Sequence, residues 1–206
     1  QRSRTVASEM AQCAVQALKD SLSEMTQYSP ELADKIRQAE DRCDHYEDIL
    51  GTYLVKLSAK RMGVQESEEA TALLKSIGDF ERISDHAVNV LEAAEELHTK
   101  GLSFSESAQA EFRVLSDAVS EILNLSLRCF EQSDVNVAAQ VEPLEQVIDT
   151  LKERIRTRHI LRMQQGTCSI EAGFILSDLI TNLERTSDHC SNIAGCVIDA
   201  ARHNLN

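Results

Sequence analysis

The sequence contains few of the residues that β architectures and nucleic-acid readers need. Its 206 residues include no tryptophan, 2 prolines and 7 glycines, and aromatic side chains make up 4%. A β-sandwich or barrel would need more proline and glycine for its many turns. So few aromatics provide no stacking platform for single-stranded nucleic acid. No apolar run approaches the roughly 20 residues of a membrane-spanning helix, and no signal peptide is visible.

Positive charge is also scarce. The chain has 34 acidic and 21 basic residues, which gives a net charge of -13. A protein that binds the phosphate backbone needs a cationic surface, so a nucleic-acid partner is excluded. Apolar residues at 42% and charged residues at 27% are typical of a soluble globular chain. The composition therefore predicts a soluble, acidic and mainly helical protein.

The cysteines show no metal or redox motif. None of the six is spaced Cys-x-x-Cys, so neither a zinc ribbon nor a thioredoxin-type motif is present. Most of them lie in helical patterns as small apolar residues, which indicates a reducing compartment. They are Cys13, Cys43, Cys129, Cys168, Cys190 and Cys196.

Apolar residues recur at spacings of three and four along the first half, which predicts amphipathic helices. Three such stripes cover residues 6–25, 32–57 and 67–94. Ser29 and Pro30 have the residue types of an N-cap and a first helical position, and Gly101 follows the third stripe. Three helices with short connections are typical of an antiparallel bundle.

The same pattern recurs in the second half. Asp134 lies 105 residues after Ser29, and apolar stripes cover residues 119–130, 144–155 and 175–197. Pro143 lies inside the fifth pattern, so that helix is expected to kink or begin late. We therefore predict an all-α fold of two tandem three-helix bundles, six helices in all. The predicted units are residues 1–101 and 102–206, with a hinge near residues 101–105.

Acidic residues recur at a fixed helical spacing in both halves. A glutamate is followed four residues later by an aspartate at four places, where random order would give about one. Residues four apart lie on one face of a helix. Each predicted unit holds one pair on its second helix and one on its third. The pairs are Glu40 with Asp44, Glu81 with Asp85, Glu145 with Asp149, and Glu184 with Asp188.

Packed helices lie roughly 8–10 Å apart, so facing pairs would bring four carboxylates around one point. Without compensation these groups would repel one another and lose their hydration. A bound multivalent cation removes that problem. Oxygen ligands suit iron(III), manganese, magnesium or calcium better than they suit structural zinc, although zinc remains a candidate. The alternative is a surface ion network of Glu81 and Asp85 with Arg82.

Further polar residues adjoin the acidic pairs of the third helices. His86 and His189 follow the aspartates, and Asn89 and Asn192 extend the acidic line by one turn. The asparagines could orient a ligand carboxylate without touching the cation, and the histidines could lean over the site. Hydrogen-bonded histidines at the core boundary and inter-helix amide bonds are the alternatives. A basic cluster favours a solvated face paired with acids over an anion or phospholipid site. It comprises Arg154, Arg156, Arg158, His159 and Arg162.

The duplicated helices, with Glu-Arg-x-x-Asp-His-x-x-Asn on the last and Glu-x-x-x-Asp on the middle helix of each unit, resemble PhoU proteins. The resemblance covers nearly the whole chain. It implies two three-helix bundles, metal clusters held by the eight carboxylates, and regulation of phosphate uptake rather than catalysis. The chain departs from the family pattern at Gly78 and Thr181, where an acidic residue often extends the motif.

Three segments are similar to the cytoplasmic PhoU-like tail of bacterial sodium/phosphate cotransporters: residues 29–31, 53–57 and 158–163. That resemblance implies a membrane domain before Gln1 and a place on the cytoplasmic side of the cell membrane. The expected partner is the membrane domain of a phosphate transporter, or a phosphate-signalling protein. A homo-oligomer is compatible with either.

Three alternatives remain at this point. The chain would be a free-standing PhoU-type regulator if no membrane helices preceded it. It would be a docking module if no metal bound. A di-iron carboxylate enzyme would need Glu-x-x-His on two helices, and only Glu95 with His98 has that spacing.

Overall fold

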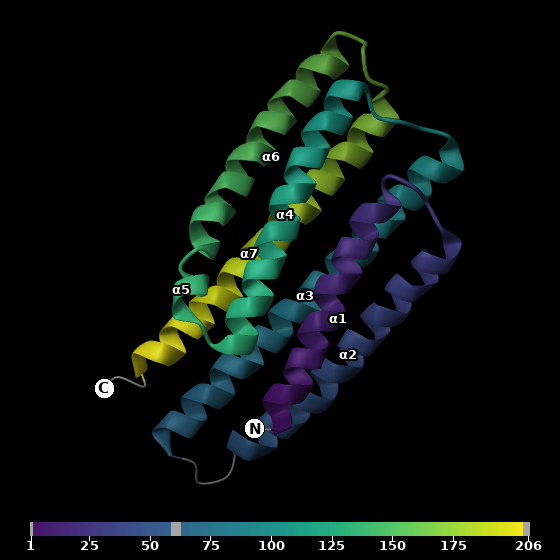
Figure 1. Cartoon of the computed structure of the whole chain (residues 1–206). Helices are drawn as coiled ribbons and strands as arrows, with labels where there is room; N and C mark the ends of the chain where they lie inside the picture. The colour runs from purple at the N-terminus through teal and green to yellow at the C-terminus, as the bar shows by residue number, and fades with distance from the viewer. Residues whose placement is uncertain (1, 59–62, 204–206) are drawn as a thin grey trace.

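The fold is all-α, as predicted. The structure is a computed structural model that describes residues 2–58 and 63–203. Six long helices and one short helix occupy that part of the chain (Figure 1). They are α1 (Arg2–Glu24), α2 (Pro30–Ser58), α3 (Val64–Lys100), α4 (Glu106–Gln132), α5 (Val135–Ala138), α6 (Val141–Gln164) and α7 (Ile170–His203).

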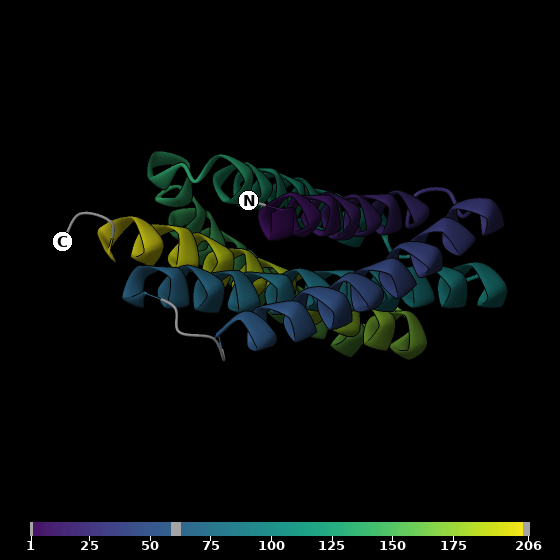
Figure 2. The same ribbon diagram turned by 90° about the horizontal axis from the view of Figure 1, so that it is seen from below.

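The long helices form two three-helix bundles that lie side by side. One contains α1, α2 and α3, and the other contains α4, α6 and α7. The bundles meet mainly along α3 and α7, which pass through the middle of the molecule (Figure 2), and α1 also packs against α4. A single buried core includes residues from both bundles. The division into units at residue 101 stays a prediction.

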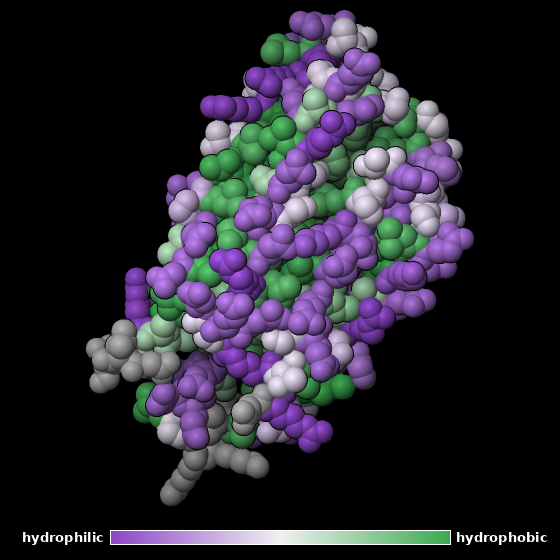
Figure 3. Space-filling model, viewed as in Figure 1, coloured by the Kyte–Doolittle hydropathy of each residue, from purple (hydrophilic) through white to green (hydrophobic). Residues whose placement is uncertain are grey.

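Phe80 shows how the two bundles share this core. It lies fully buried on α3, and its ring meets the ring of Phe130 on α4 edge-on, with centroids 5.0 Å apart. Edge-to-face aromatic pairs add to the apolar burial. The polar faces of the amphipathic helices lie outside, where Figure 3 shows mainly hydrophilic side chains with apolar patches between them. In the described residues, every helix is too short or too polar to cross a bilayer.

Proline explains the extra helix α5. Asp134 caps α5 through its side chain, which accepts hydrogen bonds from the amides of Asn136 and Val137. If α5 continued unbroken, Pro143 would have to donate to the carbonyl of Ala139, and proline has no N–H group. The chain instead breaks after α5, and α6 begins two residues before Pro143. The late helix start predicted from Pro143 is confirmed.

The connection between α3 and α4 coincides with the predicted hinge. Gly101 ends α3 in the left-handed conformation, with φ at 62°, which glycine adopts without a steric penalty. The amide of Leu102 then donates to the carbonyl of Leu97 at 2.9 Å. Ser105 begins α4, because its hydroxyl accepts from the amide of Ala108.

Candidate functional site

The structure brings the acidic residues of the first half together. Glu40 and Asp44 on α2 face Asp85 on α3, with one carboxylate oxygen of each within 4.8 Å of the others. Glu81 lies one turn before Asp85 on α3. Arg82 reaches both α3 acids, at 2.9 Å from Asp85 and 3.6 Å from Glu81. We call Glu40, Asp44, Glu81 and Asp85 the first cluster.

The electrostatics of the first cluster indicate negative charge that is not fully compensated. Burial raises the pKa of Glu81 to about 7, and the charge of Asp85 adds to the effect. Burial and like charges also raise the pKa of Glu40 and that of Asp44. Arg82 acts against the shift of Glu81, but its side chain is 63% exposed and does not cancel it. The arrangement contains the ion network considered above, and it still leaves carboxylates that repel one another.

Replacing Glu81 by glutamine is expected to stabilise the cation-free protein at pH 8 and to have little effect near pH 4.5. Because its pKa is raised from 4.5 to about 7 on folding, Glu81 binds more protons in the folded state between these values. Stability therefore rises as pH falls through that window, and above it ionised Glu81 costs on the order of 3 kcal/mol. Thermal melts in chelator at both pH values, with Glu121→Gln on exposed α4 surface as control, measure the difference. Equal effects of Glu81→Gln at both pH values would contradict the assignment.

The second half also places its acids on neighbouring helices, but of the described residues only Glu40, Asp44 and Asp85 bring three ligand oxygens within 4.8 Å of one another. Its acids are Glu145 and Asp149 on α6 with Glu184 and Asp188 on α7, and we call these four the second cluster. Burial raises the pKa of Glu145, and so do the charges of Glu142 and Asp188. Burial also raises the pKa of Asp188, followed by the charge of Glu184.

Lys152 supplies the positive charge of the second cluster. Its ammonium group lies 3.2 Å from Glu184, with side chains only 13% and 17% exposed. Lys152 lies 105 residues after Glu47, the same offset that relates the acidic pairs of α2 and α6. Glu47 is itself an acid whose pKa is raised by burial and then by Asp44. The first half therefore has an additional carboxylate where the second half has an ammonium group.

This exchange makes the two clusters different candidates for binding a cation. The first cluster offers several oxygen ligands, which is the donor set that a hard cation prefers. In the second cluster the ammonium group of Lys152 already compensates part of the charge. The acidic spacing alone makes the two clusters equivalent, because it does not include Lys152. Comparing every α6 position with the residue 105 places earlier would have identified Lys152.

The histidines and asparagines beside the clusters connect the two halves. The amide oxygen of Asn182 on α7 lies 2.8 Å from Nδ1 of His86 and accepts from Asn89 at 2.9 Å. Reciprocally, one carboxylate oxygen of Asp79 on α3 lies 2.8 Å from Nδ1 of His189. The same oxygen accepts from Asn192 at 3.2 Å. We call these six residues the interface network. The asparagines therefore make the inter-helix hydrogen bonds that were the alternative to a role in the metal site. That they also orient a ligand carboxylate stays a prediction.

The protonation of His86 follows from its surroundings. Burial lowers its pKa, so the ring is neutral near pH 7. The amide nitrogen of Asn182 donates to the carbonyl of Asp178, which leaves its oxygen facing His86. A carbonyl oxygen only accepts, so Nδ1 of His86 carries the proton. The rings of His86 and His189 are 5.6 Å apart at the centre of this network.

Two other groups from the sequence have structural partners. Arg158 and Arg162 of the basic cluster both contact Glu111 on α4, at 3.2 and 2.8 Å, which confirms the pairing with acids. Glu95, the residue on which a di-iron site would depend, accepts two hydrogen bonds from Arg37 at 3.1 and 2.8 Å. A carboxylate held in this way by a guanidinium group is a poor candidate for an iron ligand.

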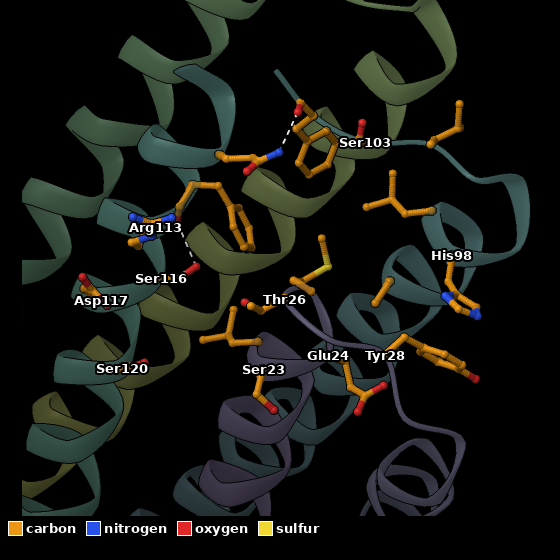
Figure 4. Close-up of a pocket in the computed structure, with 18 residues that line it drawn as sticks. Ser23, Glu24, Thr26, Tyr28, His98, Ser103, Arg113, Ser116, Asp117 and Ser120 are labelled. Carbon is orange, nitrogen blue, oxygen red and sulfur yellow. Dashed lines mark hydrogen bonds between the residues drawn. The ribbon is translucent and has the colours of Figure 1, made fainter. Parts of the chain in front are cut away.

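A cavity of about 540 Å³ lies away from both clusters. Figure 4 shows it between the α1–α2 connection, the end of α3 and α4, with Tyr28 and His98 on one side and Arg113 on the other. Glu24 forms part of its wall and accepts from the backbone amide of Ser29 at 2.8 Å. None of the eight paired carboxylates lines this cavity.

The fold and the two clusters define a class of protein: a duplicated three-helix bundle with one group of carboxylates in each half. Comparison with known proteins identifies the family. The family model described as the PhoU domain matches residues 7–94 and 112–197, one match in each half. The chain belongs to the PhoU family.

Individual relatives agree with this assignment. The chain is 22% identical over 192 residues to the phosphate-specific transport system accessory protein PhoU homolog 1 of Thermotoga maritima, covering 93% of this chain and 82% of that protein. It is 25% identical over 189 residues to the PhoU homolog of Xylella fastidiosa, covering 92% and 79%.

Solved structures share the fold. The crystal structure of PhoU from Pseudomonas aeruginosa superposes with a TM-score of 0.92 at 23% identity, over 98% of this chain and 96% of that one. The phosphate transport system regulatory protein PhoU of Streptococcus pneumoniae gives a TM-score of 0.86 at 18% identity, over 100% and 96%.

Proposed function

We propose that this protein regulates phosphate transport without catalysing a reaction. Membership of the PhoU family carries the proposal, and the relatives above are named as accessory or regulatory proteins of phosphate transport. They support a regulator that acts on a separate transport system over the tail of a sodium/phosphate cotransporter. Its partners would be a phosphate transporter at the cytoplasmic side of the membrane or a phosphate-signalling protein.

The test is phosphate uptake in a bacterium whose own PhoU gene has been deleted. Expression of this chain is expected to lower the uptake of labelled phosphate in phosphate-rich medium towards that of the parent strain. The empty vector is the baseline, and Glu121→Gln is a variant expected to behave as the unaltered protein does. Unchanged uptake despite abundant folded protein would contradict the proposal.

We also propose that the first cluster binds a hard divalent or trivalent cation. The proposal is supported by the close approach of the carboxylates of Glu40, Asp44 and Asp85 from two helices. Burial and the neighbouring negative charges also raise the pKa values of Glu40 and Asp44. A bound cation would offset that repulsion and tie α2 to α3. Iron, manganese, magnesium and calcium suit the oxygen ligands, and zinc suits them less. Lys152 makes the second cluster the weaker candidate.

A further inference from the structure

Cys13 on α1 and Cys43 on α2 lie in one layer between the two helices. The Cys13 sulfur is 3.5 Å from the carbonyl oxygen of Ala39, one turn before Cys43. The Cys43 sulfur is 3.9 Å from the carbonyl oxygen of Met10, about one turn before Cys13. Each sulfur therefore points at the helix that carries the other.

The surroundings of Cys13 favour a reactive thiolate. A guanidinium nitrogen of Arg42 lies 3.4 Å from its sulfur. The neighbouring Cys43 thiol lowers the pKa of Cys13 to about 6, and Arg42 contributes in the same direction against the effect of burial. Cys13 is half-buried and lines a cavity of about 560 Å³ together with Glu9 and Tyr46, so a small reagent has room beside it. Reactive cysteines in proteins have this combination of positive charge and partial exposure.

The partner thiol has complementary properties. Cys43 is fully buried, so a reagent from solution reaches Cys13 first. A second close pair, Cys129 on α4 and Cys190 on α7, differs because both residues are fully buried. Burial raises the pKa of Cys129 to about 11 and that of Cys190 to about 12. Cys129 and Cys190 therefore serve as an internal comparison: solvent does not reach their sulfurs, and their pKa values are raised rather than lowered.

We propose that Cys13 is a site of oxidation by small hydroperoxides and that Cys43 then closes a disulfide that links α1 to α2. The Cys13 thiolate attacks one oxygen of the hydroperoxide, the O–O bond breaks, and protonation of the leaving group gives water or an alcohol. Cys13 is thereby oxidised to a sulfenic acid. The Cys43 sulfur then displaces the hydroxyl group from Cys13, which leaves as water. In a reducing compartment such a disulfide would be transient and reversible.

The first measurement is the alkylation rate of each cysteine at pH 7, followed by peptide mass spectrometry. Relative to a thiol of ordinary pKa, the thiolate fraction of Cys13 rises about ninetyfold while its intrinsic nucleophilicity falls about twentyfold. Alkylation on the order of four times faster is therefore expected. Cys168, half-buried in the α6–α7 connection, is the reference. Arg42→Gln should slow Cys13 and leave Cys168 unchanged.

The second measurement is the product formed with hydrogen peroxide. The whole chain should lose two hydrogen atoms, and digestion without reductant should yield one peptide pair joined through Cys13 and Cys43. In Cys43→Ala, Cys13 should remain as a sulfenic acid that a 1,3-dicarbonyl reagent traps. Cys168→Ser should oxidise as the unaltered protein does. Helix content by circular dichroism checks that each variant is folded.

The outcomes separate the proposal from its rivals. A disulfide between Cys13 and Cys43 that a thiol reductant reverses supports it. Oxidation that reaches Cys168 or Cys196 as quickly as Cys13 overturns it, because the local activation would be absent. A trapped sulfenic acid at Cys13 in the unaltered protein, with no disulfide, overturns the role of Cys43. Each result is read on the unaltered chain, so it does not depend on the folding of a variant.

Discussion

Adding a hard divalent cation to chelator-treated protein is expected to raise its melting temperature, and Asp85→Asn is expected to abolish most of that rise. A ligand that binds only the folded state stabilises it by about 2.7 kcal/mol at a hundredfold excess over its Kd. Asp85 is the α3 residue whose carboxylate meets both α2 acids. In the absence of cation, Asp85→Asn should be neutral or stabilising, because a repulsive charge is removed. Thermal melts with magnesium, calcium, manganese and iron measure both effects.

Asp188→Asn provides the matched comparison, because Asp188 occupies the equivalent position in the second half. Since Lys152 already offsets part of the charge there, Asp188→Asn should leave most of the cation response intact. The ion-network alternative predicts a different pattern: Asp85→Asn would lose its contact with Arg82 and destabilise the protein mildly, with or without cation. That pattern would exclude the first cluster as the cation site.

Lys152→Glu is expected to destabilise the cation-free protein by about 3 kcal/mol and to create a new cation response. Removing one partner of a largely buried ion pair leaves the other charge uncompensated. The side chains of Lys152 and Glu184 are only 13% and 17% exposed, so solvent screens them little. The variant also gives the second cluster the acid that Glu47 supplies to the first. Urea unfolding with and without cation measures both changes.

The reverse exchange, Glu47→Lys, should weaken the cation response of the first cluster. Glu121→Lys, on the exposed surface of α4, controls for the same change in net charge. If Lys152→Glu destabilised the protein and added cation did not restore it, Lys152 would have a packing role. That result would contradict the proposal that Lys152 makes the second cluster the weaker cation site.

The six long helices could be predicted because their signals are local. The apolar stripes depend on a spacing of three and four residues, and capping residues such as Ser29 and Ser105 act within one turn. The signal for the break before Pro143 is also local, because proline has no N–H group to donate to the carbonyl four residues earlier. The four-residue helix α5 has too short a stripe to show in the pattern.

The candidate site was predictable only in part. Glu-x-x-x-Asp pairs on adjacent helices of one bundle could be expected to meet, and in the described residues three such carboxylates, of Glu40, Asp44 and Asp85, do so in the first half. The interface network could not be predicted from the sequence, because His86 and Asn182 are far apart along the chain. They meet only where one bundle packs against the other. Lys152, by contrast, could have been found from the sequence. It lies 105 residues after Glu47, which is the same offset that relates the acidic pairs of α2 and α6.

The reciprocal form of the interface network bears on how copies of the chain could associate. Each half supplies an acceptor, Asp79 or Asn182, and also a histidine and an asparagine that bind the acceptor of the other half. The first half of one copy could therefore make the same bonds with the second half of another, with only the connection at residues 101–105 rearranged. Such domain swapping introduces no new interface. Protein concentration would then set the balance between the two forms, because the single-chain arrangement benefits from a high effective concentration of its own halves.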